Sequence, residues 1–389
     1  MKTARKSGFM VVLFALMLVA LNAVTFAQSD VPDFPVKIAV MGPFTGPAAS
    51  IGQEQLNWAR LAVADFNAAN GWNVELVEGD TELDPARAVT VSEALVADAA
   101  IFGVVGPAGS QEVEAIQPQM QAAGLVHVSP SATRPSLTQN GVAEFFRVVP
   151  TDADQGPTVG NFLAGELGAT TLFIIDDQTS YSVGLADEAS AAFEAAGGEV
   201  LGRESVTQDD VDFSALVTRI RSIAPDAIFF PGQIASQGAL LARQMQEQGV
   251  EAILFGADGF QSVSDFIEGA AGATEGAYVS AFAPDIKDLE SSADTVARYT
   301  EQYGDFGTFG PPTYAAATVI LEAIWRAYEA GELTREAVRE QVAATDQALS
   351  VLGGALAFDE NGDVLDASFY IFQVQDGAFV YIPVMSDEE

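Results

Sequence analysis

Ser110 follows a short apolar run and a Gly-Pro-Ala-Gly turn in the stretch VVGPAGS (104–110), and a helical pattern follows it in QEVEAIQPQMQAAG. Backbone N–H groups at the start of a helix point outward, and the helix dipole favours negative charge there. The Gly-Lys-Ser/Thr ending of a P-loop is missing, so no lysine is supplied for a triphosphate. The stretch therefore predicts a site for a smaller anion, with Ser110 at the helix N-cap.

A second hydroxyl-rich turn, SPSATRPSLT (129–138), follows the next apolar run and carries Ser129, Ser131 and Thr133. If the two runs are adjacent parallel strands, both turns present hydroxyls and free N–H groups at one sheet edge, which favours an oxyanion cradle. Ser and Thr in turns also cap helices and bond their own backbone, however. Both interpretations stay open at this point.

Two polar side chains follow strand-like runs in the second half of the chain. Tyr181 comes shortly after TLFIIDD (171–177), and Asp258 comes directly after AILFGA (252–257). A carboxylate at a strand end can face a ligand cation across a cleft, although a helix N-cap is an equal alternative for Asp258. An anion cradle on one side and an acid on the other fit a zwitterion such as an α-amino acid.

Motifs of enzymes and metal sites are absent or weak. The chain has no Cys and a single His, His127, which lies in the strand-like run LVHVSP and is interpreted as a packing residue. Neither a Ser-His-Asp triad nor a transition-metal site can therefore be built. The pair Asp176-Asp177 reads as turn and cap residues, and DENGD (359–363) as a hairpin turn rather than a calcium loop. We expect no catalytic residue, metal or cofactor; a secreted glycosidase with two carboxylates is the remaining enzyme alternative.

Apolar runs alternate with helical patterns along most of the chain, which predicts an α/β fold with parallel sheets covered on both faces. The strand-like runs fall into two sets: 36–42, 73–80, 101–106 and 125–130, then 171–177, 199–206, 226–232, 252–259 and 276–284. We expect two Rossmann-like lobes joined by a three-crossing hinge, with crossings near 147–150, 281–284 and 355–358. Long helices after 285, including 314–331, would return to the first lobe, and the tail would form hairpins at ENGD and QDGA.

The first residues predict export. Lys2, Arg5 and Lys6 precede an apolar run from Phe9 to Leu21, and Thr25-Phe26-Ala27 is typical of a signal-peptide cleavage site. We expect a signal peptide over 1–27 and a periplasmic or extracytoplasmic protein, with a single membrane anchor as the alternative. No Cys is available for a lipid anchor. The formal net charge of −37 disfavours nucleic acid and anionic lipid as partners; a saline habitat and composition drift both explain it.

Several stretches together resemble the leucine/isoleucine/valine-binding proteins, the amino-acid branch of the type I periplasmic binding proteins that serve ATP-binding-cassette (ABC) importers. The resemblance runs from about 34 to 384 and rests on the order of KIAVMGPFTGPAASIGQ, VVGPAGS, VSPSATRPSLT, FFRVVPTDADQGP, DFSALVTRI, FGADG and FDENGD. It implies a first lobe of residues 34–149 plus 283–355 that binds the carboxylate. The second lobe would comprise 150–282 plus 356–384.

The resemblance also implies roles for individual residues. Ser110, Ser131 (through its main chain) and Thr133 would bind the ligand carboxylate, and Asp258 would bind the ammonium group. Tyr181, Ile51, Gln233, Phe309 and Gly109 would line the side-chain pocket.

Two of these positions depart from the branched-chain binders, in which Ile51 and Gln233 are both tyrosines. The departures leave the identity of the amino acid open, and another small carboxylate, an amide or a short peptide is the alternative ligand. The expected partner is an ABC permease, and the expected oligomeric state is a monomer.

Overall fold

The computed structural model describes residues 31–139 and 141–383. The expected signal peptide therefore lies outside the described residues. Residues 31–34 belong to a separate N-terminal unit, and the fold below begins at Pro35. Within the described part of the chain, none of the helices combines the length and the apolar character that crossing a membrane requires.

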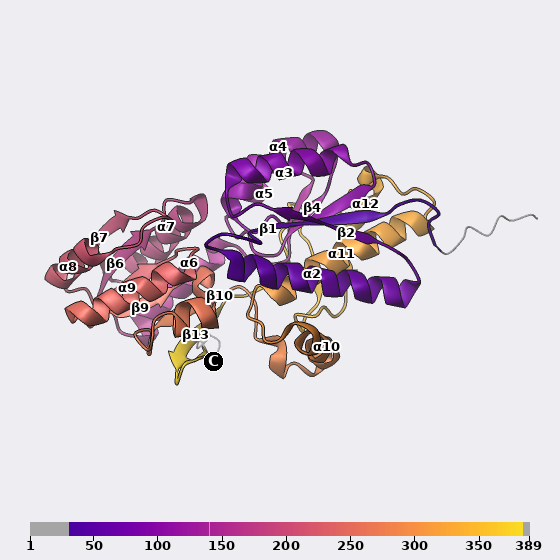
Figure 1. The fold of residues 1–389 in the computed structure, drawn as a ribbon. Coiled ribbons are helices and arrows are strands. Elements are labelled where there is room, and N and C mark those ends of the chain that lie inside the picture. The colour runs from indigo at the N-terminus through magenta and orange to yellow at the C-terminus, as the bar shows by residue number, and fades with distance from the viewer. Residues whose placement is uncertain (1–30, 140, 384–389) are drawn as a thin grey trace, which may run out of the picture. The chain divides into compact units, whose positions relative to one another are not determined.

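The first sheet has five parallel strands in the order β2-β1-β3-β4-β5 (Figure 1). Its strands are β1 (Lys37–Gly42), β2 (Glu75–Asp80), β3 (Ile101–Val105), β4 (His127–Ser129) and β5 (Phe145–Arg147). The first four were predicted. The last was not, because it has only three residues and runs into the stretch near 147–150 that we interpreted as a crossing between lobes.

Helices cover both faces of this sheet, as the continuous apolar strands require. They are α2 (Ala49–Asn70), α3 (Pro85–Ala97), α4 (Ser110–Ala123), α5 (Ser136–Gln139), α11 (Gly310–Glu329) and α12 (Arg335–Ala343). Alternate residues of β1 point to opposite faces: Val40 packs in a cluster with α2 and α11, and Met41 in a cluster with α3 and α4. The long helix α11 thus returns to the first sheet, as predicted.

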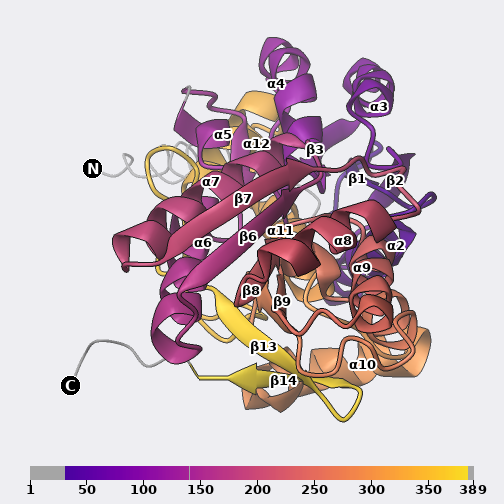
Figure 2. The ribbon, with the colours of Figure 1, turned by 90° about the vertical axis from the view of Figure 1, so that its left-hand side faces the viewer.

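The second sheet has seven strands in the order β14-β13-β10-β9-β8-β6-β7 (Figure 2). Five are parallel: β6 (Thr171–Asp176), β7 (Glu199–Ser205), β8 (Ala227–Phe230), β9 (Ile253–Gly256) and β10 (Tyr278–Ala281). The antiparallel edge is the predicted hairpin of β13 (Tyr370–Gln375) and β14 (Ala378–Ile382). Its turn residues Asp376 and Gly377 both have positive φ, as a two-residue hairpin turn favours.

The helices of this half are α6 (Asp152–Asn161), α7 (Ser180–Ala195), α8 (Ser214–Ile223) and α9 (Ala235–Gln248). A π-helical turn over Phe162–Glu166 continues α6. Three elements lie outside the two main sheets and their helices. The helix α10 (Ala293–Tyr303) precedes α11, and the short antiparallel pair of β11 (Asp346–Gln347) and β12 (Leu356–Ala357) follows α12. The α/β class with parallel-dominated sheets in two lobes is therefore as predicted.

The third passage between the sheets lies later in the chain than expected. We placed it at 355–358 and assigned residues from 356 onward to the second lobe, but Phe358 packs in the core of the first sheet, 5.1 Å from Phe146 between ring centroids. Asp363 bonds to Arg147 at the end of β5. Gly362 has φ +94°, and a Cβ there would lie 2.5 Å from the carbonyl oxygen of Phe145. The change of sheet thus falls between residue 364 and the start of β13.

Candidate functional site

The carboxyl ends of strands from both sheets surround one small cavity. Its volume is about 20 Å³, and it is lined by Ile51, Leu83, Ala108, Ser110, Ser131, Tyr181, Gln233, Asp258, Gly259 and Phe309. Seven of the nine residues singled out from the sequence are in this lining; Thr133 and Gly109 are not. Side chains separated by up to 258 positions in the sequence therefore lie around a common space.

Ser110 is the first residue of α4 rather than its N-cap, which corrects our expectation. The N-cap is Gly109, in an extended conformation, and its N–H donates to Glu112 Oε2 at 2.7 Å. A Cβ on Gly109 would lie 2.9 Å from that same oxygen, so the capping contact leaves no room for a side chain. This arrangement leaves the Ser110 hydroxyl free of the capping role and puts it in the cavity wall.

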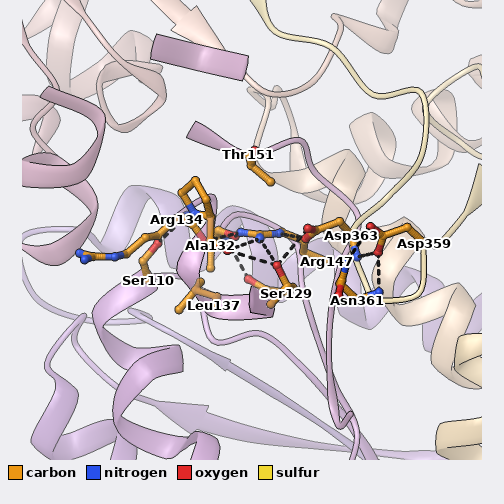
Figure 3. A network of polar contacts seen from close by, with 12 residues as sticks. Ser110, Ser129, Ala132, Arg134, Leu137, Arg147, Thr151, Asp359, Asn361 and Asp363 are labelled. Carbon is orange, nitrogen blue, oxygen red and sulfur yellow. Dashed lines mark hydrogen bonds and ion pairs between the residues drawn. The ribbon is translucent and has the colours of Figure 1, made fainter. Parts of the chain in front are cut away.

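The turn after β4 is tied to the turn before α4. Ser129 Oγ accepts N–H groups of residues 131 and 132 and donates to Pro107 O, so the local-bonding alternative is correct for this serine. Ser131 Oγ donates to Ala108 O at 2.9 Å and accepts from Gln55. The N–H of Arg134 donates to Ser110 Oγ at 3.3 Å (Figure 3). Two hydroxyl-bearing turns thus form one wall of the cavity.

Asp258 lies across the cavity from these turns, in a short 3₁₀ turn after β9. It is 4% exposed, and its Oδ1 accepts hydrogen bonds from Tyr181 Oη and Gln155 Nε2, both at 2.7 Å. The structure gives it no side-chain capping bond, so the N-cap alternative does not describe it. Burial raises the pKa of Asp258 to about 6, and burial also raises the pKa of Tyr181 well above its ordinary value.

A second buried carboxylate, Asp152, was missed by the sequence analysis. It is the first residue of α6 and is fully buried, and its N–H donates to the carbonyl oxygen of Thr133 at 2.9 Å. Burial, together with the negative charge of Asp258, raises its pKa to about 7. An acid in the first turn of a helix is common for structural reasons, so the stretch PTDADQGP gave no functional signal.

The remaining wall is part apolar and part amide. Ile51 and Phe309 pack in one apolar cluster, with the Phe309 ring 5.1 Å from that of Phe282. Gln233 Oε1 accepts from Gln111 Nε2 at 2.9 Å and from Gln208 Nε2 at 3.1 Å. Ile51 and Phe309 also line a neighbouring cavity of about 630 Å³. The side-chain end of the site is therefore bounded by two apolar residues, Ile51 and Phe309, and by the amide of Gln233.

Contacts between the two halves close the site. Gln111 from α4 meets Gln233 after β8, and Arg134 Nη1 donates to the carbonyl oxygen of Ser180 at the start of α7 at 2.6 Å. A cavity of about 20 Å³ holds roughly one water molecule. A larger ligand can enter only if the two halves separate or the lining side chains move.

Other candidate chemistry from the sequence has structural explanations. His127 is fully buried with its ring centroid 5.0 Å from that of Phe145, as predicted for a packing residue, and burial lowers its pKa to about 3. Asp177 accepts from Thr179 and from the N–H of Gln233. Among the residues that the structure describes, no group of three or more His, Cys, Asp or Glu is placed to hold a metal ion.

Comparison with known proteins places this arrangement in a family. Residues 35–378 match the family described as periplasmic binding protein. The leucine-, isoleucine-, valine-, threonine- and alanine-binding protein of Pseudomonas aeruginosa is 32% identical over 365 residues, which cover 93% of this chain and 94% of that protein. A leucine-binding protein from Thermotoga maritima superposes with a TM-score of 0.82 at 28% identity, over 91% of this chain and 99% of that one. A branched-chain amino acid transporter substrate-binding protein from Streptococcus pneumoniae, solved with isoleucine, has a TM-score of 0.81 at 25% identity, over 90% of this chain and 100% of that one. The chain belongs to the periplasmic binding protein family.

Proposed function

We propose that the protein binds an α-amino acid between its two lobes and delivers it to an ABC importer. One observation carries this proposal: hydroxyl-bearing turns and a buried carboxylate face each other across one enclosed cavity. The relatives named above for branched-chain and small amino acids support it. The expected export signal then fits a protein that works outside the cytoplasm.

The turns around Ser110 and Thr133 would take the ligand carboxylate. Ser110 lies at the start of a 14-residue helix, where unpaired N–H groups and the helix dipole favour an anion. Its hydroxyl and that of Thr133 add donors, and hydrogen bonds to an ionised group are roughly twice as strong as neutral ones.

Asp258 would take the ammonium group, with Asp152 close by. Both carboxylates are buried, and a buried ionised carboxylate is stable only when it is paired. A ligand ammonium supplies that partner. A carboxylate ligand without a cation would instead add a third negative charge to the region, so the site favours a zwitterion over a plain acid.

Ligand binding would be coupled to closure of the lobes. The first lobe would comprise the first sheet with its helices, and the second lobe the second sheet; the passages between them are the hinge. In the open state the amino acid would bind the hydroxyl turns, and closure would add Asp258 and Tyr181. Gln233, Ile51 and Phe309 would then contact the ligand side chain, with Gln233 offering an amide where an apolar wall would suit leucine best.

Isothermal titration calorimetry on the full chain tests this function. The titrants are the L-enantiomers of leucine, isoleucine, valine, threonine, alanine and glutamine, with benzoate as an acid that has no cation. We expect at least one amino acid to bind with a dissociation constant in the micromolar range or below and benzoate to bind at least about 100-fold more weakly. Binding of benzoate alone would replace the proposal with a plain carboxylate-binding function. If none of the six amino acids binds, amino-acid binding is refuted.

A further inference from the structure

Arg147 is the one arginine in the described part of the chain with a fully buried side chain, and it lies beside the carboxylate-binding turn without touching the cavity. It is the last residue of β5. An arginine offers five N–H donors in a rigid planar fork, so its neighbours must supply acceptors in fixed directions. The arrangement of those acceptors shows what the residue does.

Backbone carbonyls of the turn after β4 supply two of the acceptors. Arg147 Nη1 donates to the carbonyl oxygen of Ala132 at 3.2 Å and to that of Arg134 at 2.7 Å (Figure 3). Arg147 Nη2 donates to Thr138 Oγ1 at 2.9 Å. The guanidinium therefore holds the turn from residue 132 to residue 138 at several points.

The contact with Ala132 fixes the direction of the peptide between Ala132 and Thr133. A trans peptide is planar, and its C=O and N–H point in opposite directions. The peptide between Ala132 and Thr133 is not cis. Because the carbonyl of Ala132 faces the guanidinium, the N–H of Thr133 in the same peptide points away from it. Next along the chain, the N–H of Arg134 reaches Ser110 Oγ. Arg147 thus orients the peptide before Thr133 and holds the carbonyl of Arg134, the residue after it.

The opposite side of the guanidinium is held by the last passage between the sheets. Asp363 Oδ1 accepts from Arg147 Nε at 2.5 Å, and Asp363 Oδ2 accepts from Thr138 Oγ1 at 2.9 Å. The backbone N–H of Arg147 donates to Gly362 O at 3.0 Å. The turn is itself ordered by Asp359, which accepts the N–H groups of residues 361 and 363 (Figure 3). Asp363 thereby fixes the orientation of the Arg147 guanidinium relative to the turn of residues 132–138.

We propose that Arg147 is a positioning residue for ligand binding: its guanidinium holds the carbonyls of Ala132 and Arg134 so that the Thr133 N–H and hydroxyl face the ligand carboxylate. The expected effect of Arg147 on ligand affinity rests on the proposed amino-acid function. Its expected effect on the backbone of the turn does not. The residue touches no ligand. Its hydrogen bonds go to the turn, and so its main effect falls on the carboxylate end of the ligand.

The test compares Arg147→Met and the milder Arg147→Lys with Arg335→Met. Arg335 is a matched control because it also donates to three backbone carbonyls of the first lobe, those of Val96, Asp98 and Ile101, at the far end of β3 from the cavity. The probes are whichever of L-leucine and L-alanine the wild type binds more tightly, and the carboxamide of the same amino acid. Calorimetry or NMR titration gives the affinities. Hydrogen–deuterium exchange of the ligand-free proteins shows how well ordered the backbone of residues 132–134 is.

We expect Arg147→Met to weaken binding of the amino acid at least about 10-fold and binding of its amide less than about 3-fold, because only the acid uses the charge-assisted bonds. Arg147→Lys should show the same selectivity with a smaller loss. Amide exchange at 132–134 should speed up in both variants, and Arg335→Met should change neither quantity. Equal losses for acid and amide, or unchanged exchange at 132–134, would overturn the proposal. If the wild type binds neither probe, the affinity comparison is made with the amino acid of the panel above that binds most tightly. If no amino acid of that panel binds, the amino-acid function fails, and the exchange result alone decides whether Arg147 positions the turn.

Discussion

At the scale of single residues, the site is defined by groups that the protein leaves incompletely paired. Asp258 is buried, yet its hydrogen-bond partners Tyr181 and Gln155 are neutral. Ionising such a group costs free energy unless a cation is near. The raised pKa values of Asp258 and Asp152 are consistent with a site whose missing partner is an ammonium group.

Replacing Asp258 tests that partnership. Asp258→Ala and Asp258→Asn should each weaken amino-acid binding at least about 30-fold, because the ligand ammonium would be desolvated without a counter-charge. Asp226→Asn is the matched control: this acid of the same lobe accepts bonds from Thr170 and Thr171 beside the opposite ends of the strands. Calorimetry that gives an unchanged dissociation constant for both Asp258 variants would remove this residue from the site.

The pH dependence of affinity follows from the same two carboxylates. Burial raises the pKa of Asp258 to about 6 and that of Asp152 to about 7, so both are largely protonated at pH 5. A ligand ammonium favours the ionised forms, and binding at low pH must therefore release protons. Affinity should rise from pH 5 to about pH 8 and level off above that, with a smaller rise in Asp152→Asn. Titrations that show constant or falling affinity over this range would contradict the assignment.

The residue types in the sequence predicted which side chains line the cavity better than they predicted the local structural role of each side chain. Ser110, Tyr181 and Asp258 could be chosen because each follows an apolar strand, and parallel strands bring their carboxyl ends together. The N-cap assignment of Ser110 was wrong because the preceding glycine can itself cap the helix with help from Glu112. Asp152 could not be chosen, since an acid at a helix start looks the same whether or not it faces a ligand.

At the scale of elements, the last passage between the sheets is anchored by an ion pair. Arg147 is fully buried, and its partner Asp363 is 26% exposed at the side chain. The two residues are 216 positions apart. No local pattern in the sequence indicates such a pairing, which is why the apolar stretch ending at Phe358 was taken for the start of the second lobe.

Removing the acid from this pair should strongly destabilise the protein. Asp363→Ala leaves a buried guanidinium without its counter-charge, which typically costs about 3–5 kcal/mol. Asp305→Ala is a suitable control, because Asp305 is a largely exposed partner of Lys287 and such surface pairs contribute at most about 1 kcal/mol. Urea unfolding of both variants measures the free energies of unfolding. A loss below about 1 kcal/mol for Asp363→Ala would show that the pair does not hold the passage in place.

The strands and long helices were predictable because their periodicity is strong. The run from Ile38 to Gly42 is apolar and buried throughout, and both of its faces are covered by helices. Short elements were not predictable: β5 has only three residues, and β11 and β12 have two each. Their existence depends on neighbours that are distant in sequence, so no local window contains the reason for them.

At the scale of the whole molecule, the proposed binding requires two lobes that move apart and close. The lobe boundaries stay a proposal. Contacts such as Gln111 to Gln233 form only when the halves meet around the cavity. A cavity that holds about one water also requires movement before an amino acid can enter.

Weakening the closed state should therefore weaken binding without touching either charged end of the ligand. Gln111→Ala removes one hydrogen bond between the halves, and such a bond contributes about 0.5–1.5 kcal/mol. We expect a loss of affinity of about 2- to 10-fold. Gln302→Ala, at an exposed site on α10, should have no effect. Small-angle X-ray scattering with and without ligand gives the accompanying change in radius of gyration; identical radii and an unchanged affinity would argue against closure.

In the proposed function both ends of a zwitterion are held at once, one by each lobe. The most direct measurement compares the tightest-binding L-amino acid of the panel with two analogues of equal size, its carboxamide and the acid that lacks the amino group. We predict that each analogue binds at least about 30-fold more weakly than the amino acid in calorimetric titrations. An analogue that lacks the amino group and still binds as tightly as the amino acid would contradict the account.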